Sequence, residues 1–166
     1  RASNGVLLIT TKKGKGDALR LSFSSIVSMQ QALGVADMMS RDEFAELINS
    51  RGTAAQKALL GEASTDWLAQ VFQQAIGTDN NLSLQGKIAK TLPFRASVGY
   101  YDQQGTLRTD RSERMTGSLV LSPTFFDQHL SVNLNLKGAR NNNRFANTDA
   151  IWSAIAFNPT QPIYSS

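Results

Sequence analysis

The sequence predicts a mainly β fold: an antiparallel segment of a transmembrane β-barrel, with about five strands and a helical insertion in the first long loop. Three observations support this. Apolar and polar residues alternate, long and short connections alternate, and no apolar run is long enough for a membrane helix. Such a helix needs ~20 apolar residues, whereas no apolar run is longer than Val6-Leu7-Leu8-Ile9. If this chain crosses a membrane, we expect it to do so with strands.

Alternation with a period of two marks strands that have one apolar face. The clearest case places Leu130, Val132, Leu134 and Leu136 opposite Ser131, Asn133, Asn135 and Lys137. Four similar segments begin at Leu19, Leu82, Phe94 and Met115. A soluble β-sandwich shows the same alternation. A soluble β-rich binding module with no transport role is therefore the alternative prediction.

The connections between these segments favour the barrel. Long connections at 31–80 and from 138 onward, and a medium one at 103–112, alternate with short ones at 90–93 and 123–128. Outer-membrane barrels have long outer loops and tight periplasmic turns. We therefore expect 31–80 to be a helical extracellular loop and 138–166 to be a further extracellular loop. The first strand would then run outward.

Aromatic pairs lie near the expected strand ends. Tyr100 and Tyr101 fall toward the outer end of the third strand, and Phe125 and Phe126 fall at the periplasmic turn. These are the two levels at which aromatic girdles meet the membrane interfaces. The alternative is that they are ordinary core or turn residues.

The first long loop carries helix signals. Ser40-Arg41-Asp42-Glu43 has the form of a capping box, and Gly52 is a suitable C-terminal stop. A second short helix is expected from Thr65, before Gly77. Amphipathic helices must pack on something. The loop therefore either covers the barrel mouth or meets a partner, and the sequence does not choose between these.

Composition excludes several classes of function. The net charge is +4 and the pI about 9.6, but the basic residues are scattered, which argues against nucleic acid. Cysteine is absent, and His129 is the only histidine, so no metal site, cofactor or catalytic site is expected. Gly14-Lys15-Gly16 lacks the spacing of a phosphate loop and suits a flexible joint. We predict that the chain is not an enzyme.

Four segments of the chain carry a family resemblance. They are Arg1 to Gly14, Asp66-Trp67 through Gln73 to Gly86, Ala96 to Gly105, and Arg114 to Leu121. Together they resemble the SusC/RagA-like family of TonB-dependent outer-membrane importers, and the matches are colinear from Arg1 to roughly Asn143.

This resemblance implies a plugged barrel of roughly 22 strands in the outer membrane of a Gram-negative bacterium. Residues 1–16 would be the C-terminal end of the plug domain and the plug–barrel junction, and residues 17–166 the N-terminal part of the barrel. The resemblance also implies energy from TonB, through a segment absent here, and a SusD-like lipoprotein partner. The cargo would be small oligosaccharides or peptides, and the chain would be one piece of this larger importer. The junction signature contains Asn4, Gly5, Thr10, Thr11, Lys12, Lys13 and Gly14.

The lumen-facing polar residues are the natural candidates for binding cargo, because amides, hydroxyls and aromatic rings suit sugars and peptides. The same side chains also suit a wet wall that faces the plug, and this simpler role is the favoured interpretation. The candidates are Arg95, Tyr101, Gln85, Asn133 and Asn135.

Overall fold

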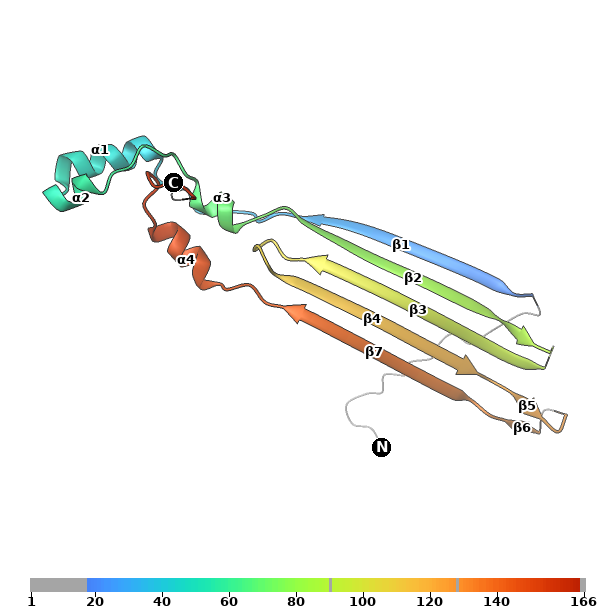
Figure 1. The fold of residues 1–166 in the computed structure, drawn as a ribbon. Helices are drawn as coiled ribbons and strands as arrows, with labels where there is room; N and C mark the ends of the chain where they lie inside the picture. The colour runs from blue at the N-terminus through green and yellow to red at the C-terminus, as the bar shows by residue number, and fades with distance from the viewer. Residues whose placement is uncertain (1–17, 90, 128, 165–166) are drawn as a thin grey trace, which may run out of the picture. The chain divides into compact units, whose positions relative to one another are not determined.

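The computed structural model describes residues 18–89, 91–127 and 129–164. Five strands form one sheet in the order β1-β2-β3-β4-β7, and their directions alternate along it (Figure 1). The antiparallel five-stranded sheet is thus confirmed, with β1 and β7 at its two edges. The strands are β1 Arg20–Gln30, β2 Ala75–Ile88, β3 Leu92–Gln104, β4 Arg111–Leu121 and β7 Leu134–Arg144.

The chain forms two compact units. Among the described residues, unit 1 contains 18–27, 78–102 and 113–142. Unit 2 contains 28–77, 103–112 and 143–164. Unit 1 is therefore sheet, whereas unit 2 holds one end of each of the five strands together with the helices.

The fifth strand differs from the expectation. The alternating segment 130–137 is divided: β6 (Leu130–Ser131) pairs with β5 (Thr124–Phe125) in a small two-stranded sheet, and β7 begins only at Leu134. β7 then continues to Arg144, through residues that we expected to form a loop from 138. β2 likewise begins at Ala75, inside the expected loop 31–80. Apolar alternation marks only the part of a strand that has one apolar face. It therefore misses the polar end of β7 and the start of β2, where residues 78–81 are polar on both faces.

The helices confirm the capping signal and add two elements. α1 (Arg41–Arg51) has the expected capping box between Ser40 and Glu43, with Gly52 as its C-cap. α3 (Trp67–Val71) is the expected second helix, capped by Asp66. The sequence analysis missed α2 (Ala54–Ala58) and α4 (Asp149–Ala156). α2 has its own capping box, between Thr53 and Gln56.

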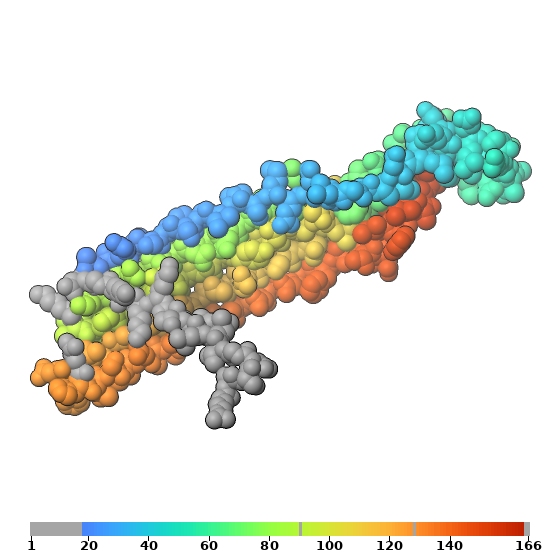
Figure 2. Space-filling view, turned by 180° about the vertical axis from the view of Figure 1, so that it is seen from behind, coloured from blue at the N-terminus to red at the C-terminus, as the bar shows by residue number. Residues whose placement is uncertain are grey.

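The two faces of the sheet differ in chemistry and exposure. On the apolar face of unit 1, Phe23 is 67% exposed, Val98 53% and Leu136 54%. Across the described ranges, only Leu68, Ala75, Val120 and Ala154 are buried apolar residues. Figure 2 shows the strands side by side in the order of the sheet, from β1 in blue to β7 in red. Among the described residues, the apolar face is therefore exposed instead of forming a core.

No helix among the described residues is long and apolar enough to cross a membrane.

Candidate functional site

Arg95 lies at the centre of a hydrogen-bonded group on the polar face of unit 1. Its guanidinium donates to Gln85 Oε1 at 2.7 Å and to Ser83 Oγ at 3.3 Å, both on the neighbouring strand β2. Next along β3, the hydroxyls of Ser97 and Ser118 are 2.7 Å apart and connect β3 to β4. Alternation sets these side chains on one face, and the antiparallel register brings them together. The structure therefore joins two of the candidate residues, Arg95 and Gln85.

Tyr101 is on the same polar face, farther along β3. The guanidinium carbon of Arg114, on β4, lies 5.3 Å from the centre of the Tyr101 ring, which is a cation–π distance. Tyr100 is 41% exposed and alternates onto the apolar face. Of this aromatic pair, only Tyr100 is therefore placed where a girdle residue would meet lipid. The girdle itself is still a prediction.

Asn133 and Asn135 are separate from the Arg95 group. Asn133 precedes β7, and its Oδ1 accepts a hydrogen bond of 3.0 Å from Ser122 Oγ. Asn135 follows on β7 and is exposed. Both asparagines are thus on the edge strand or next to it, and the five candidates do not form one cluster.

In unit 2, a glycine allows side chains to meet across a strand. Ser28 Oγ on β1 donates to Gln103 Oε1 on β3 at 3.1 Å, although β2 lies between these strands. A Cβ on Gly77 of β2 would overlap the amide oxygen of Gln103 and crowd Ser28 Oγ. Glycine is therefore required at this point of close approach.

The segment after α4 is bound tightly to the loop between α2 and α3. Thr160 is fully buried, and its Oγ1 accepts from the backbone N–H of Gly61 at 2.8 Å. The indole Nε1 of Trp67 donates to the Asn158 carbonyl at 2.9 Å. The Trp67 ring also packs edge-on against Phe157, with centroids 4.8 Å apart. These contacts join segments about ninety residues apart and make the helical part of unit 2 a packed structure.

An apolar groove of about 670 Å³ lies within unit 2. Its walls come from the segment before α1, from α1 and α3, and from the end of α4. The lining residues that carry its character are Met38, Met39, Phe44, Trp67, Leu68 and Phe157, with Asp37, Arg41 and Asp66 among the polar members. Concave apolar surfaces with a few polar groups are where proteins bind ligands or partners.

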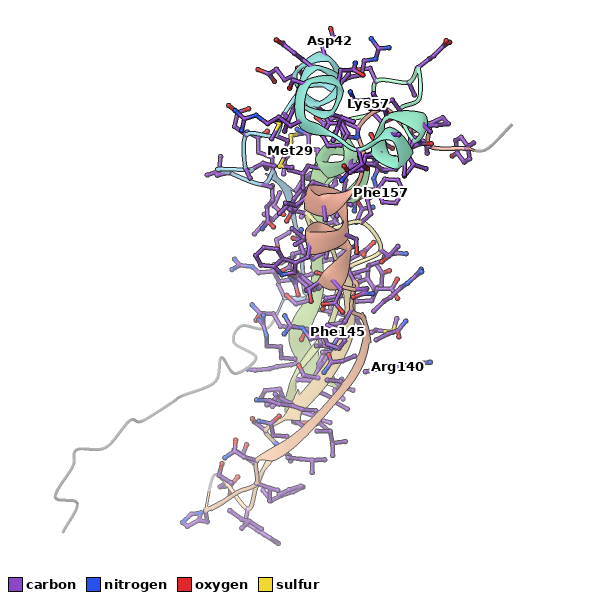
Figure 3. The ribbon with its side chains drawn as sticks, turned by 90° about the vertical axis from the view of Figure 1, so that its left-hand side faces the viewer. Met29, Asp42, Lys57, Arg140, Phe145 and Phe157 are labelled. Carbon is purple, nitrogen blue, oxygen red and sulfur yellow. The ribbon has the colours of Figure 1, made fainter. Side chains whose placement is uncertain are left out.

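The charged groups at the start of α1 interact within that helix and its cap. Arg41 Nη1 pairs with Asp42 Oδ1 at 2.9 Å. The carboxylate of Glu43 accepts from the backbone N–H and from the hydroxyl of Ser40, both at 2.8 Å. The hydrogen bond from the Ser40 backbone, and then that from its side chain, lower the pKa of Glu43. Asp42 on α1 and Lys57 on α2 are exposed, and neither lines the groove (Figure 3).

No group of three or more potential metal ligands occurs in the described parts of the chain. His129 lies in the expected turn and is exposed, with its Nδ1 2.6 Å from the Phe126 carbonyl. The arrangement offers hydrogen bonding and apolar contact, which are the means of binding rather than of bond cleavage.

The expected junction residues Asn4, Gly5, Thr10, Thr11, Lys12, Lys13 and Gly14 lie outside the described residues. Sequence reasoning missed the groove and the buried segment around Thr160. A signal was available, since the apolar residues from Ile151 to Ile155 precede Phe157-Asn158-Pro159, a helix followed by a turn. It could not have shown which loop this turn would contact.

The chain is similar along its whole length to part of two TonB-dependent receptors. It is 43% identical over 168 residues to the TonB-dependent receptor SusC of Bacteroides thetaiotaomicron, covering 100% of this chain and 17% of that protein. It is 28% identical over 178 residues to the TonB-dependent receptor P3 of Formosa agariphila, again covering 100% of this chain and 17% of the relative. The chain therefore spans about a sixth of the length of these relatives. No protein-family model matches it.

The fold is similar to part of a solved importer. The RagAB peptide importer in its open-open state matches with a TM-score of 0.65 and 26% identity, over 89% of this chain and 20% of that chain. Its closed-closed state matches with a TM-score of 0.64 and 24% identity, over 83% of this chain and 19% of that chain. This second match shows the fold alone. All these relatives are named as receptors or importers, not as enzymes.

Proposed function

We propose a transport function for this chain, starting from its confirmed similarity to a segment of the SusC/RagA-like TonB-dependent transporters. In this proposal, residues 17–166 form the first part of an outer-membrane barrel, and residues 1–16 form the end of its plug and the junction. Strands beyond these five close the barrel, and TonB supplies energy through a segment outside this chain. The assembled protein imports nutrients.

One observation carries the proposal: the sheet has an exposed apolar face and a hydrogen-bonded polar face. A soluble protein covers its large apolar surfaces, whereas Phe23, Val98 and Leu136 are all more than half exposed. In a membrane barrel, lipid covers this face and the polar face lines the interior. The same exposure argues against the soluble binding module.

The interior face suggests where cargo passes. We propose that Arg95, Gln85 and Tyr101 line the barrel wall, and that Asn133 and Asn135 extend it toward the periplasmic turns. The Arg95 donors already bind Gln85 and Ser83. Their first role is therefore to stiffen the wall against the plug, and a second is to present polar groups to passing peptide or oligosaccharide fragments.

The groove of unit 2 suggests where a partner binds. The connection between β1 and β2, and the segment after β7, both belong to long loops that we place outside the membrane. We propose that a SusD-like surface lipoprotein docks there, because Met38 and Met39 offer adaptable apolar contact at the rim of the groove. The similar solved structure is named as the RagAB peptide importer.

The test uses the full-length protein in its native outer membrane. It should fractionate with outer membranes, require detergent for extraction, copurify with a surface lipoprotein, and take up labelled peptide or oligosaccharide only when TonB is active. Met39→Glu should reduce the copurified lipoprotein, whereas Lys57→Glu, at an exposed position of α2 that does not line the groove, should not. A soluble protein would overturn the proposal. Uptake that is independent of TonB would refute the mechanism.

A further inference from the structure

Two glycines lie opposite each other on the apolar face of unit 1. The hydrogen bonds Ser122–Asn133 and Asn142–Glu113 each give the register of β4 against β7. Counting from either pair places Gly117 opposite Gly138. The same side of β4 carries Met115 and Leu119, so both glycines interrupt an otherwise apolar surface.

These two glycines differ from the other glycines of the sheet. Gly77, Gly86 and Gly99 are buried, and a Cβ on any of them would crowd side chains of neighbouring strands. A Cβ on Gly117 or Gly138 would meet no atom within 4 Å. Glycine weakens a strand and contributes no side chain to packing. Packing within this part of the chain therefore does not explain the facing pair.

The pair forms the floor of a shallow groove along β4 and β7. Two adjoining hollows share Val98, Gly117 and Gly138. One continues to Leu119 and Leu136, and the other to Met115 and Arg140. The walls are thus apolar side chains, the floor is backbone, and one end carries a cation.

Arg140 stands where the apolar surface ends. In the same register it is opposite Met115, and the next pair on this face is Glu113 with Asn142, both polar. Arg140 is exposed and projects from β7 (Figure 3), and within the described part of the chain its guanidinium has no acidic partner. An arginine at the end of an apolar groove has the chemistry to bind the phosphate of a lipid.

We propose that this groove holds one acyl chain of a phosphorylated membrane lipid, with the lipid phosphate against Arg140. This inference rests on the proposed function, since it needs the apolar face to contact lipid. The two glycines give a methylene chain space to lie against the backbone, where side chains at both positions would exclude it.

The test reconstitutes the full-length protein in nanodiscs that contain a phosphatidylglycerol with a photoactivatable group in its acyl chain. We expect adducts concentrated at Met115, Leu119 and Leu136. Gly138→Val fills the groove and should reduce these adducts to about a tenth, because it removes the buried contacts of several methylenes. The wild-type protein should be labelled more by this phosphatidylglycerol than by a phosphatidylcholine with the same probe. Arg140→Gln should abolish this preference.

Two controls make the result decisive. Arg144→Gln changes an arginine of the same strand and face, four residues beyond the groove, and should leave labelling as in the wild type. Excess inorganic phosphate should not compete, because it lacks the acyl chain. Uniform labelling over the whole apolar face, or protection by a second copy of the protein, would contradict the proposed lipid groove. Neither outcome would affect the proposed transport function. A protein absent from the outer membrane would refute the proposed function itself.

Discussion

At the scale of single residues, the five glycines of the sheet divide by what surrounds them. Gly77 lies beneath the hydrogen bond between Ser28 and Gln103, and Gly99 lies beneath Asn81 and Thr116, whose oxygens would be 2.6 Å from an added Cβ. Both allow polar side chains to lie across a strand. Gly117 and Gly138 have no such neighbours. The residue type is the same, but the physical role is set by the adjacent strands.

We therefore expect Gly77→Ala to destabilise the protein by about 1–3 kcal/mol, because the new methyl group forces the Ser28–Gln103 pair apart. Gly117→Ala is the matched control, since its methyl group meets no atom within 4 Å, and its free energy of unfolding should be unchanged or slightly higher. Denaturant unfolding of the full-length protein in detergent measures both. Equal effects of the two substitutions would contradict the assignment of Gly77.

At the scale of elements, α1 depends on its cap. It has no buried residue, so tertiary packing contributes little to its stability, and the Ser40–Glu43 box satisfies its first backbone N–H groups. The pattern was recognisable in the sequence because a capping box is local. α2 repeats the same device with Thr53 and Gln56, and α3 uses Asp66 alone.

Ser40→Ala should weaken α1 by about 1 kcal/mol, which corresponds to a roughly five-fold loss of amide-exchange protection in residues 41–51. Ser50→Ala in the same helix is the control. The Ser50 hydroxyl bonds only the Leu47 carbonyl, so its removal should leave protection nearly unchanged.

The same helix should respond to acid. The Ser40 hydrogen bonds hold the pKa of Glu43 below its ordinary value, so the ionised form stabilises the folded cap. That contribution is complete above the ordinary carboxyl range and is lost as the pH falls through the lowered pKa. Protection of α1, corrected for the intrinsic pH dependence of exchange, should fall in this acidic range. Ser40→Ala should remove the dependence, and an unaltered pH profile in that variant would argue against Glu43 as its source.

At the scale of the whole molecule, the side chains on the two faces of the sheet indicate which medium each face contacts. Within unit 1, adjacent residues of β1 point to opposite faces, with Leu21 on the apolar face, 66% exposed, and Ser22 on the polar face. In the proposed barrel, this distribution of side chains places lipid on one side of the sheet and water on the other.

Leu21→Lys should therefore reduce the stability of the membrane-inserted protein by roughly 2–4 kcal/mol if Leu21 lies near the bilayer centre, whereas Ser22→Lys should have little effect. The folded fraction in lipid vesicles, followed by heat-modifiable gel mobility, compares the two variants directly. Similar losses would mean that both faces meet the same medium, as they would in a soluble protein.

The sequence by itself determined the strand segments, their two faces, and the caps of α1, because each depends on contacts within a few residues. Only the tertiary structure decided that Arg95 meets Gln85 and Ser83, that Thr160 is buried beside Gly61, and that Gly117 faces Gly138. These pairs depend on the register between strands and on loop contacts across up to about a hundred residues. A local pattern cannot specify such distances, since many registers satisfy the same alternation. The ends of β2 and β7 escaped prediction for a related reason: beyond the apolar band, hydrogen bonds between polar side chains of neighbouring strands, such as Ser25–Asn80 and Asn142–Glu113, depend on the register.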